Sequence, residues 1–369
     1  MDVGQAGRAA WSRPAGKEAE TALKTETGTA GGSDGILGVA LLSFAHTHAD
    51  GYARQVRDHP RARLAVVWDE DAERGRQAAQ RYGVPFEREL DAVLARPDVA
   101  GVVCTAPSAL HPRVLLASAR AGRHIFTEKV LALTVADCDR ILAAVREAGV
   151  RLVVSMPALC DAELRWLKSA LDAERFGRVT MLRVRIGHRA ALERWFPPES
   201  WFGDPRQAGG GALMDLGCHP VYRLRYLMGE PLAVTARLTN VAGTYGIDDN
   251  GAVLLEFPGG ALGIVEASWV QEGGPEGLAL YGTAGWALVG YPGAPIRCGG
   301  EAFTGSQGGS LLPGRLPPAW RPPLQQWIEA VLDGTEPELR PEWGRQLTEI
   351  LQAAYTSSRE DRTVRWPIA

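Results

Sequence analysis

The sequence is poor in lysine, in closely spaced cysteines and in long apolar runs. Its 369 residues contain only four lysines among 40 basic residues, so arginine carries almost all of the positive charge. No apolar run approaches the roughly 18 residues that a transmembrane helix needs. The N-terminus also lacks the apolar stretch of a secretory signal, so we do not expect one. The net charge of −3 gives no general attraction to nucleic acid or to an acidic membrane.

The cysteines argue against a disulfide framework and against a structural zinc site. Their number is odd, their spacings are wide and no CxxC pair occurs. We therefore expect no bound metal, and we expect a reducing, cytoplasmic compartment. The five are Cys104, Cys138, Cys160, Cys218 and Cys298.

The chain length predicts two domains, at roughly 150 residues per domain. Residues 1–34 are rich in Gly, Ala and Thr with little apolar periodicity, which predicts a disordered extension. Residues 35–155 alternate short apolar runs with helical stretches, which predicts a doubly wound parallel sheet of the Rossmann type. The expected strands are 36–42, 64–68, 99–104, 124–127 and 151–155, and the expected helices 49–58, 71–82, 111–121 and 134–148.

Residues 156–369 follow a different rhythm and predict a second α/β domain with a largely antiparallel open sheet. Strands are expected at 179–187 and, with hairpin-like spacing, near 233–241, 251–257, 261–270, 277–282 and 286–290. Helices are expected at 161–174, 211–228, 322–333 and 342–357, and a loop at 300–320.

The first strand-to-helix turn is where a dinucleotide pyrophosphate would bind, but all three glycines of the G-x-G-x-x-G fingerprint are absent. Ser43 and Ala45 are small enough for close backbone approach, whereas His48 is a clear departure. We predict cofactor contacts from Ser43, Phe44, Ala45, His46 and His48. The alternative is an ordinary turn whose histidines only cap the helix.

Asp69 stands at the end of the second predicted strand. A carboxylate there accepts hydrogen bonds from the adenosine ribose and repels a 2′-phosphate, which predicts NAD in preference to NADP. The alternative is a solvated acid in an Asp-Glu-Asp run.

The third strand leads into a proline-containing loop at the same edge of the sheet. Thr105, Pro107, Ser108 and His111 are its predicted cofactor contacts, and Ser108 is a natural N-cap for the following helix. For His111, packing at the helix start is as plausible as a role in the site.

Glu128 and Lys129 follow the fourth strand, where ligands bind in such sheets. Outside the first 34 residues the sequence has only one other lysine, Lys168, on a polar helical stretch. Lysine offers a compact ammonium whose pKa responds to burial, so we expect Lys129 to be catalytic. Both Glu128 and Lys129 are also expected to contact the cofactor.

The segment from Gly209 to His219 is the most informative. Three consecutive glycines allow close backbone approach at a helix start, and Asp215 and His219 are four residues apart, which places them on one helical face. A carboxylate beside an imidazole is suited to removing a hydroxyl proton. The alternative is a buried Asp–His capping pair.

Together these motifs resemble the Gfo/Idh/MocA family of NAD(P)-dependent oxidoreductases over about residues 36–366. The resemblance implies hydride transfer between NAD and a CH–OH group of a sugar, cyclitol or related polyol. It also implies Lys129, Asp215 and His219 as catalytic residues, and a homodimer or homotetramer formed through the second sheet. On this basis we expect His219 to take the hydroxyl proton, Asp215 to stabilise the imidazolium, and Lys129 to polarise the hydroxyl or shuttle its proton.

The sequence departs from the family pattern in three places. Val130 replaces the usual proline after the lysine, Met156 to Cys160 replaces the usual substrate-contacting residues, and the turn glycines are missing. Two alternative functions therefore remain open at this stage: a non-catalytic dinucleotide or sugar sensor, and an NAD-dependent glycosidase.

Overall fold

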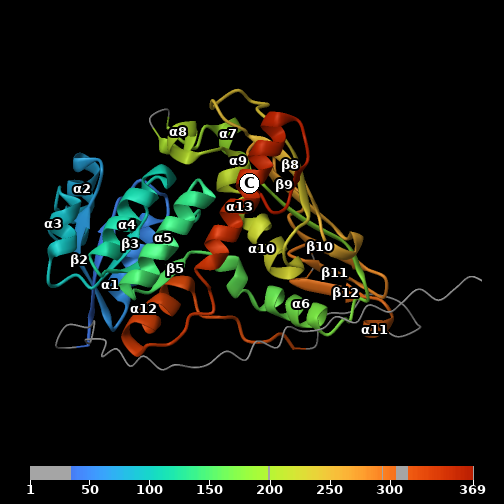
Figure 1. Ribbon diagram of the computed structural model, residues 1–369, viewed down its shortest axis with the longest axis horizontal. Coiled ribbons are helices and arrows are strands. Elements are labelled where there is room, and N and C mark those ends of the chain that lie inside the picture. The colour runs from blue at the N-terminus through green and yellow to red at the C-terminus, as the bar shows by residue number, and fades with distance from the viewer. Residues whose placement is uncertain (1–34, 198–199, 293, 305–314, 369) are drawn as a thin grey trace, which may run out of the picture.

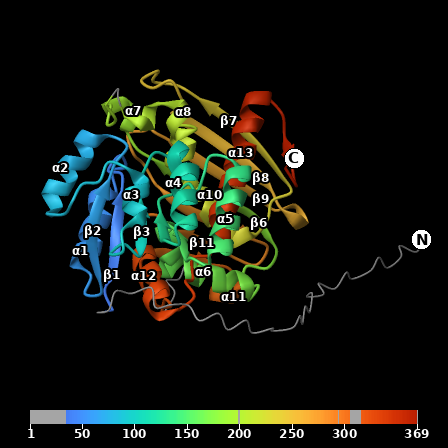
Figure 2. The same ribbon diagram turned by 60° about the vertical axis from the view of Figure 1, so that its left-hand side comes forward.

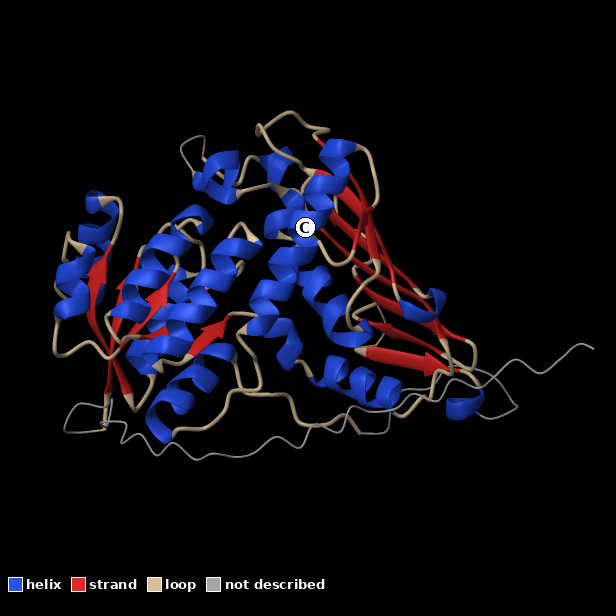
Figure 3. Ribbon diagram, viewed as in Figure 1, coloured by secondary structure: helices blue, strands red, loops and turns tan. Residues whose placement is uncertain are grey.

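The computed structural model describes residues 35–197, 200–292, 294–304 and 315–368. The predicted N-terminal extension lies outside these ranges, as do residues 305–314 of the predicted loop at 300–320. Figures 1 and 3 show two sheets, each with helices packed against it, joined by segments that cross between them.

The N-terminal sheet is parallel, and in the described chain it has five strands in the order β2-β1-β3-β4-β5. Helices cover both faces, which explains why the strands are almost continuously apolar. Beyond β2, Phe86 forms a single parallel bridge with Val67, in the place of a further strand. These findings confirm the predicted Rossmann sheet. Its strands are β1 (Leu37–Leu42), β2 (Ala62–Trp68), β3 (Gly101–Cys104), β4 (His124–Thr127) and β5 (Leu152–Val154).

The helices of this sheet follow the predicted alternation closely. Glycines in the left-handed conformation end two of them, Gly83 at φ 67° and Gly149 at φ 63°. Figure 2 shows α4 and α5 side by side in front of the sheet. The bounds are α1 (Ala49–Asp58), α2 (Ala72–Tyr82), α3 (Leu90–Ala95), α4 (His111–Arg120) and α5 (Val135–Ala148).

A helix from the end of the chain completes this layer. α12 (Pro323–Asp333) packs against β4 and β5, and its Trp327 is fully buried beside Phe126. A Cβ at Gly101 would lie 2.7 Å from the Trp327 ring, so glycine is required for this contact. The C-terminal part of the chain therefore contributes to both layers, and the predicted boundary at residues 155/156 stays a prediction.

The second sheet has eight strands among the described residues, in the order β12-β11-β10-β6-β9-β8-β7-β13. β6 and β9 are parallel, and the other neighbouring pairs are antiparallel. Burial alternates along β8, as expected for a sheet with one face against helices. β12 and β13 were not predicted. The bounds are β6 (Val179–Gly187), β7 (Ala233–Thr239), β8 (Asn250–Glu256), β9 (Leu262–Ser268), β10 (Gly277–Gly282), β11 (Trp286–Val289), β12 (Ile296–Gly299) and β13 (Val364–Arg365).

Helices α6, α10 and α13 pack against this sheet. The predicted helix at 211–228 is wrong in one respect, because it is broken into α9 and α10 at Leu216 and Gly217. A Cβ at Gly217 would lie 2.9 Å from that of Ala267 on β9, so glycine is needed where the chain passes this close to the sheet. The bounds are α6 (Ala162–Asp172), α7 (Ala190–Glu193), α8 (Pro205–Ala208), α9 (Ala212–Asp215), α10 (Cys218–Met228), α11 (Glu301–Thr304) and α13 (Glu342–Glu360). None of the described helices is long and apolar enough to cross a bilayer.

Candidate active site

The candidate site lies where the carboxyl ends of the parallel strands meet the segment that contains α8 and α9. The strand arrowheads point toward that side of the molecule (Figures 1 and 3). A cavity of about 420 Å³ lies there, between α1, the ends of β4 and β5, and the first residues of α10 and α12. Its lining includes His48, Tyr52, Glu128, Lys129, Ser155 and His219.

Lys129 forms an ion pair across the two layers. Its Nζ donates to the Asp215 carboxylate at 2.8 Å and to the Asp215 carbonyl at 2.6 Å. Burial alone would lower the pKa of Lys129, but the negative charge of Asp215 raises it above its ordinary value. The same pairing lowers the pKa of Asp215, against the effect of burial. The pairing therefore favours the ammonium form of Lys129, which donates the hydrogen bonds, and the ionised form of Asp215.

The backbone beyond Lys129 is fixed although Val130 replaces proline. The Lys129–Val130 peptide bond is cis, and the Val130 carbonyl accepts a hydrogen bond from His111 Nδ1 at 2.8 Å. The other ring nitrogen of His111 lies 3.1 Å from the Ala106 carbonyl, so this fully buried imidazole ties the loop after β3 to the end of β4. Of the two interpretations of His111, the structure favours packing.

The Asp215–His219 pair is not formed as expected. Because the helix breaks after Asp215, that carboxylate contacts Lys129, while His219 Nδ1 lies 3.0 Å from the Tyr222 hydroxyl. Burial and the Lys129 charge lower the pKa of His219 to about 3. His219 is therefore neutral at physiological pH and lines the cavity as a hydrogen-bonding group.

The glycine segment approaches two neighbours, as its composition predicted. A Cβ at Gly210 would lie 2.0 Å from the Tyr355 hydroxyl of α13, and one at Gly211 would lie 1.8 Å from the Asp248 carbonyl. The Asp248 carboxylate accepts hydrogen bonds from the amides of Gly211 and Leu213 at 2.8 and 2.9 Å, which fixes the start of α9. This role of Asp248 was not predicted from the sequence pattern.

The turn between β1 and α1 keeps a glycine-like backbone without glycine. Ser43 has φ 76°, in the left-handed region, and its carbonyl accepts a hydrogen bond from Thr105 Oγ1 at 2.5 Å. The Ala45 carbonyl accepts one from Trp201 Nε1 at 3.1 Å, which joins the turn to the second layer. α1 begins at Ala49, and its N-cap residue, His48, forms no side-chain capping bond. The suggestion that the histidines cap the helix is therefore wrong for His48.

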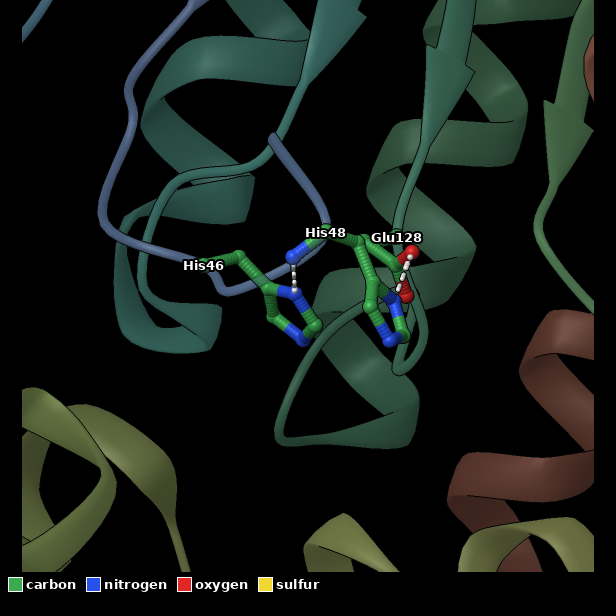
Figure 4. Close-up of side chains that lie close together, drawn as sticks. All are labelled: His46, His48 and Glu128. Atoms are coloured by element: carbon green, nitrogen blue, oxygen red, sulfur yellow. Dashed lines mark hydrogen bonds and ion pairs between the residues drawn. The ribbon is translucent and has the colours of Figure 1, made fainter. Parts of the chain in front are cut away.

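The two histidines of this turn differ in their surroundings (Figure 4). His46 is buried, which lowers its pKa to about 4, and its Nδ1 accepts the His48 backbone N–H at 3.1 Å. Its Nε2 has no hydrogen-bond partner among the described residues. His48 is half exposed, and its Nδ1 lies 2.9 Å from Glu128 Oε1.

Ligand atoms of His46, His48 and Glu128 lie within 4.8 Å of one another, close enough to consider a metal. However, Glu128 Oε1 already accepts hydrogen bonds from His48 and Tyr52, and Oε2 accepts the Lys129 N–H. A metal would have to replace these bonds. The cluster therefore has an internal hydrogen-bonding explanation, and the absence of a bound metal stays a prediction.

Asp69 is buried and its carboxylate accepts hydrogen bonds from neighbouring residues. It is therefore not the solvated acid of the alternative interpretation. Its two oxygens accept the backbone N–H groups of Phe44 and Asp71, and both also accept from the Arg74 guanidinium. Glu70 is the more accessible carboxylate. It pairs with Arg74 and accepts a hydrogen bond from Ser43 Oγ at 3.1 Å. Glu70 was not predicted as a site residue, although it stands beside Asp69.

The remaining predicted residues lie along the edge of the sheet. Thr105, Pro107 and Ser108 are buried in the loop after β3, and Ser108 lines a small hollow beside Lys129, Trp201 and Asp215. Ser108 is not the predicted N-cap, because a 3-10 turn at Ser108–Leu110 intervenes and Leu110 precedes α4. Tyr52 and Ser155, which the sequence analysis missed, lie 2.9 Å apart at the cavity.

Comparisons with known proteins agree with this fold. The family model described as an oxidoreductase family with an NAD-binding Rossmann fold matches residues 35–156, and that of the GFO/IDH/MocA C-terminal domain matches residues 164–288. Myo-inositol 2-dehydrogenase of Thermotoga maritima is 24% identical over 344 residues, covering 90% of this chain and 97% of the relative.

Two further relatives show higher identity. 1,5-Anhydro-D-fructose reductase of Ensifer adhaerens is 29% identical over 224 residues, which cover 59% of this chain and only 65% of that reductase. The crystal structure of GenD2 from gentamicin A biosynthesis in complex with NAD is 29% identical with a TM-score of 0.75, covering 89% of this chain and 96% of that one. The two matched domain models together span most of the described residues, and the chain belongs to the Gfo/Idh/MocA family of NAD-binding oxidoreductases.

Proposed function

We propose that this protein is an NAD-dependent dehydrogenase that oxidises a CH–OH group of a sugar, cyclitol or related polyol, or reduces the corresponding ketone. The observation that carries the proposal is the Lys129–Asp215 ion pair at a cavity that His219 also lines. The named activities of the inositol dehydrogenase and anhydrofructose reductase relatives support the substrate class.

The residues at the turn fit a dinucleotide diphosphate. The first amides of a helix have no partners within the helix and attract phosphate, and the N-terminus of α1 has no side-chain cap. Since His46 Nδ1 accepts a hydrogen bond, its Nε2 carries the proton and is a buried donor without an acceptor in the described chain. A phosphate oxygen would satisfy it.

The charges at the end of β2 support NAD in preference to NADP. Arg74 would suit a 2′-phosphate, but Asp69 and Glu70 already neutralise it and leave a net negative charge. We propose that Glu70 accepts the ribose hydroxyls and that Asp69 fixes the turn through Phe44.

When bound, the nicotinamide supplies a hydride acceptor or donor. We propose that this chain's residues then act on the substrate oxygen. The Lys129 ammonium donates a hydrogen bond that polarises it, and neutral His219 orients the hydroxyl. Asp215 keeps Lys129 charged and fixes the position of its ammonium group. Neutral His219 lines the same cavity as Lys129 and is the proposed acceptor of the hydroxyl proton.

Thermal unfolding with NAD⁺, NADH, NADP⁺ or NADPH tests the cofactor proposal. A ligand at 100 times its Kd stabilises the folded state by about 2.7 kcal/mol. We expect stabilisation by NAD⁺ and NADH, followed by NADH formation with a member of a polyol panel. An NADP(H)-selective shift would contradict the cofactor choice. A ligand response without turnover would favour a sensor, and release of an aglycone without net NADH would favour a glycosidase.

We also propose a homodimer or homotetramer and a cytoplasmic location. The cysteines support a reducing compartment, because all five are buried and Cys104, Cys138, Cys160 and Cys218 are free thiols in the structure.

A further inference from the structure

Arg223 is a partly buried cation beside the candidate site, and the steps proposed above do not use it. It lies on α10 and has no hydrogen-bond or ion-pair partner among the described residues. Its guanidinium nitrogens are not sealed from solvent, so another molecule can reach them. Partial burial removes hydration from this guanidinium that no described protein group replaces, and an anion bound to it would therefore be stabilising.

Helix geometry and charge place this guanidinium near His219. Arg223 follows His219 by four residues in α10, so the two side chains lie on one face of the helix. Side chains of a helix lean toward its N-terminus, which brings the guanidinium back toward the imidazole. Burial and the Lys129 charge lower the pKa of His219, and the Arg223 charge lowers it further, as expected for neighbouring groups.

A second element locates Arg223 relative to the cavity. His219 lines the cavity, and so does Pro157, the first residue of the 3-10 turn Pro157–Cys160, which contacts α10. Asp161 follows that turn. Burial raises the pKa of Asp161 and the Arg223 charge opposes the rise, yet no ion pair joins the two. The guanidinium therefore lies just beyond His219, where α10 meets the turn, about 6 Å along the helix axis for four residues.

The charges of the cavity itself are largely compensated. Lys129 is paired with Asp215, and the Glu128 carboxylate accepts hydrogen bonds from three donors. Arg54 on the cavity wall has no ion-pair partner within the described part of the chain, so the cations without partners at this site are arginines. An anionic group that enters the cavity would therefore be attracted toward Arg223 or Arg54, and Arg223 is the one beside the proposed proton acceptor.

We propose that Arg223 binds an anionic group of the substrate, which makes the substrate an acidic sugar or cyclitol. The inference rests on the proposed function and narrows its substrate class. The anion is a carboxylate or a phosphate, because a guanidinium binds either through two parallel hydrogen bonds. It lies about one helical turn, or about 6 Å, from the reacting CH–OH group. Arg223 holds the substrate with its hydroxyl at Lys129 and His219, and takes no part in proton or hydride transfer.

The first test compares matched acidic and neutral sugars as substrates with NAD⁺. The pairs are glucuronate with glucose, galacturonate with galactose, and glucose 6-phosphate with glucose. We expect the wild type to oxidise one acid with a kcat/KM about tenfold or more above that of its neutral partner, and the identity of that acid distinguishes carboxylate from phosphate. In Arg223→Gln, kcat/KM for the acid should fall about 10- to 100-fold, mainly through KM, as for a lost hydrogen bond to a charged group. The neutral partner should be unaffected.

A binding measurement does not depend on turnover. Isothermal titration calorimetry of the NADH-loaded protein with the same sugars keeps the dinucleotide site filled, so anions that would bind there are not counted. We expect one acid to bind the wild type more tightly than its neutral partner, and Arg223→Gln to bind the two equally. Arg223→Lys should keep part of the preference, because an ammonium retains the charge without the two-pronged geometry.

Two further variants serve as controls. Arg225→Gln removes an arginine of the same helix that already pairs with Glu230, and Arg54→Gln removes the cation of the cavity wall. Both should keep the preference for the acidic sugar. If Arg54→Gln loses the preference while Arg223→Gln retains it, the anion binds at α1 and the inference is wrong.

Two other results would overturn it. One is a wild type that binds and oxidises acidic and neutral partners equally well, and the other is an acid preference that persists in Arg223→Gln. The proposed function fails in a different way, through a wild type that binds no dinucleotide or oxidises neither acidic nor neutral polyols. A wild type that oxidises neutral polyols at a rate unchanged in Arg223→Gln supports the proposed function and excludes only this role of Arg223.

Discussion

At the residue scale, Lys129 allows the contribution of one side chain to kcat to be tested. It is the buried lysine of the described chain, and it is paired with a carboxylate from the other layer. Replacement by Met removes the donor to the substrate oxygen and leaves Asp215 unpaired. We expect kcat to fall by about 100-fold or more, as for the loss of a donor that stabilises developing charge. Steady-state assays with NAD⁺ and the best polyol measure this change.

Lys168 offers a matched control for that variant. It lies on α6 in a surface pair with Asp172, where such pairs contribute about 1 kcal/mol or less. Lys168→Met should therefore keep kcat within threefold of wild type. A Lys129→Met protein that is folded and retains more than a tenth of the wild-type kcat would show that Lys129 is not catalytic.

His124 permits a prediction about stability that does not involve the site. Burial, with a smaller effect of Arg151, lowers its pKa to about 4, and its Nδ1 accepts the Arg151 backbone N–H. Below about pH 6.5 the unfolded chain binds a proton at this residue that the folded protein does not. The stabilisation is therefore complete above pH 6.5 and is lost as the pH falls toward 4.

Urea unfolding at pH 7 and pH 5 measures this loss. We expect the free energy of unfolding to be lower at pH 5, with a smaller decrease in His124→Gln, which keeps an acceptor for the Arg151 N–H. Equal decreases in the two proteins would contradict the assignment.

At the element scale, the glycines before α9 hold the Asp215 carboxylate in register. A Cβ at Gly211 would collide with the Asp248 carbonyl, so Gly211→Ala must displace the start of α9 and with it Asp215. We expect a loss of about 1–3 kcal/mol in stability, as for overpacking of a core. The Lys129–Asp215 contact should loosen and kcat should fall. Chemical unfolding and steady-state kinetics measure the two effects.

Gly246→Ala is the control, because a Cβ there meets nothing within 4 Å and the residue is exposed. Its stability should stay within about 0.5 kcal/mol of wild type. If Gly211→Ala is as stable and active as Gly246→Ala, the glycine does not position Asp215.

The same elements show what sequence reasoning can and cannot provide. The strands of the first sheet were predictable because buried parallel strands are continuous apolar runs, and Gly83 and Gly149 marked helix ends. The break between α9 and α10 was not predictable from the local sequence pattern. Likewise, spacing suggested an Asp215–His219 pair. The contacts actually formed, Asp215 with Lys129 and His48 with Glu128, join residues 86 and 80 positions apart.

At the scale of the whole molecule, the second sheet has a face that its own helices do not cover. α10 and α13 pack on one side, and in Figures 1 and 3 the described helices α6, α10 and α13 lie on that same side. On the other side, Thr235, Leu254, Ile264 and Arg183 lie in register on neighbouring strands, and Leu254 is 38% exposed. Such a row of apolar and charged residues is suited to contact with a second copy of the chain.

We therefore expect the purified protein to be a dimer or tetramer, as measured by light scattering after size-exclusion chromatography. Leu254→Arg places a charge in the middle of the sheet face and should shift the protein toward monomer. Leu192→Arg is the matched control, because Leu192 is 49% exposed on α7, away from this face, and the oligomer should persist. A monomeric wild type, or an oligomer that Leu254→Arg leaves intact, would assign the association to another surface or exclude it.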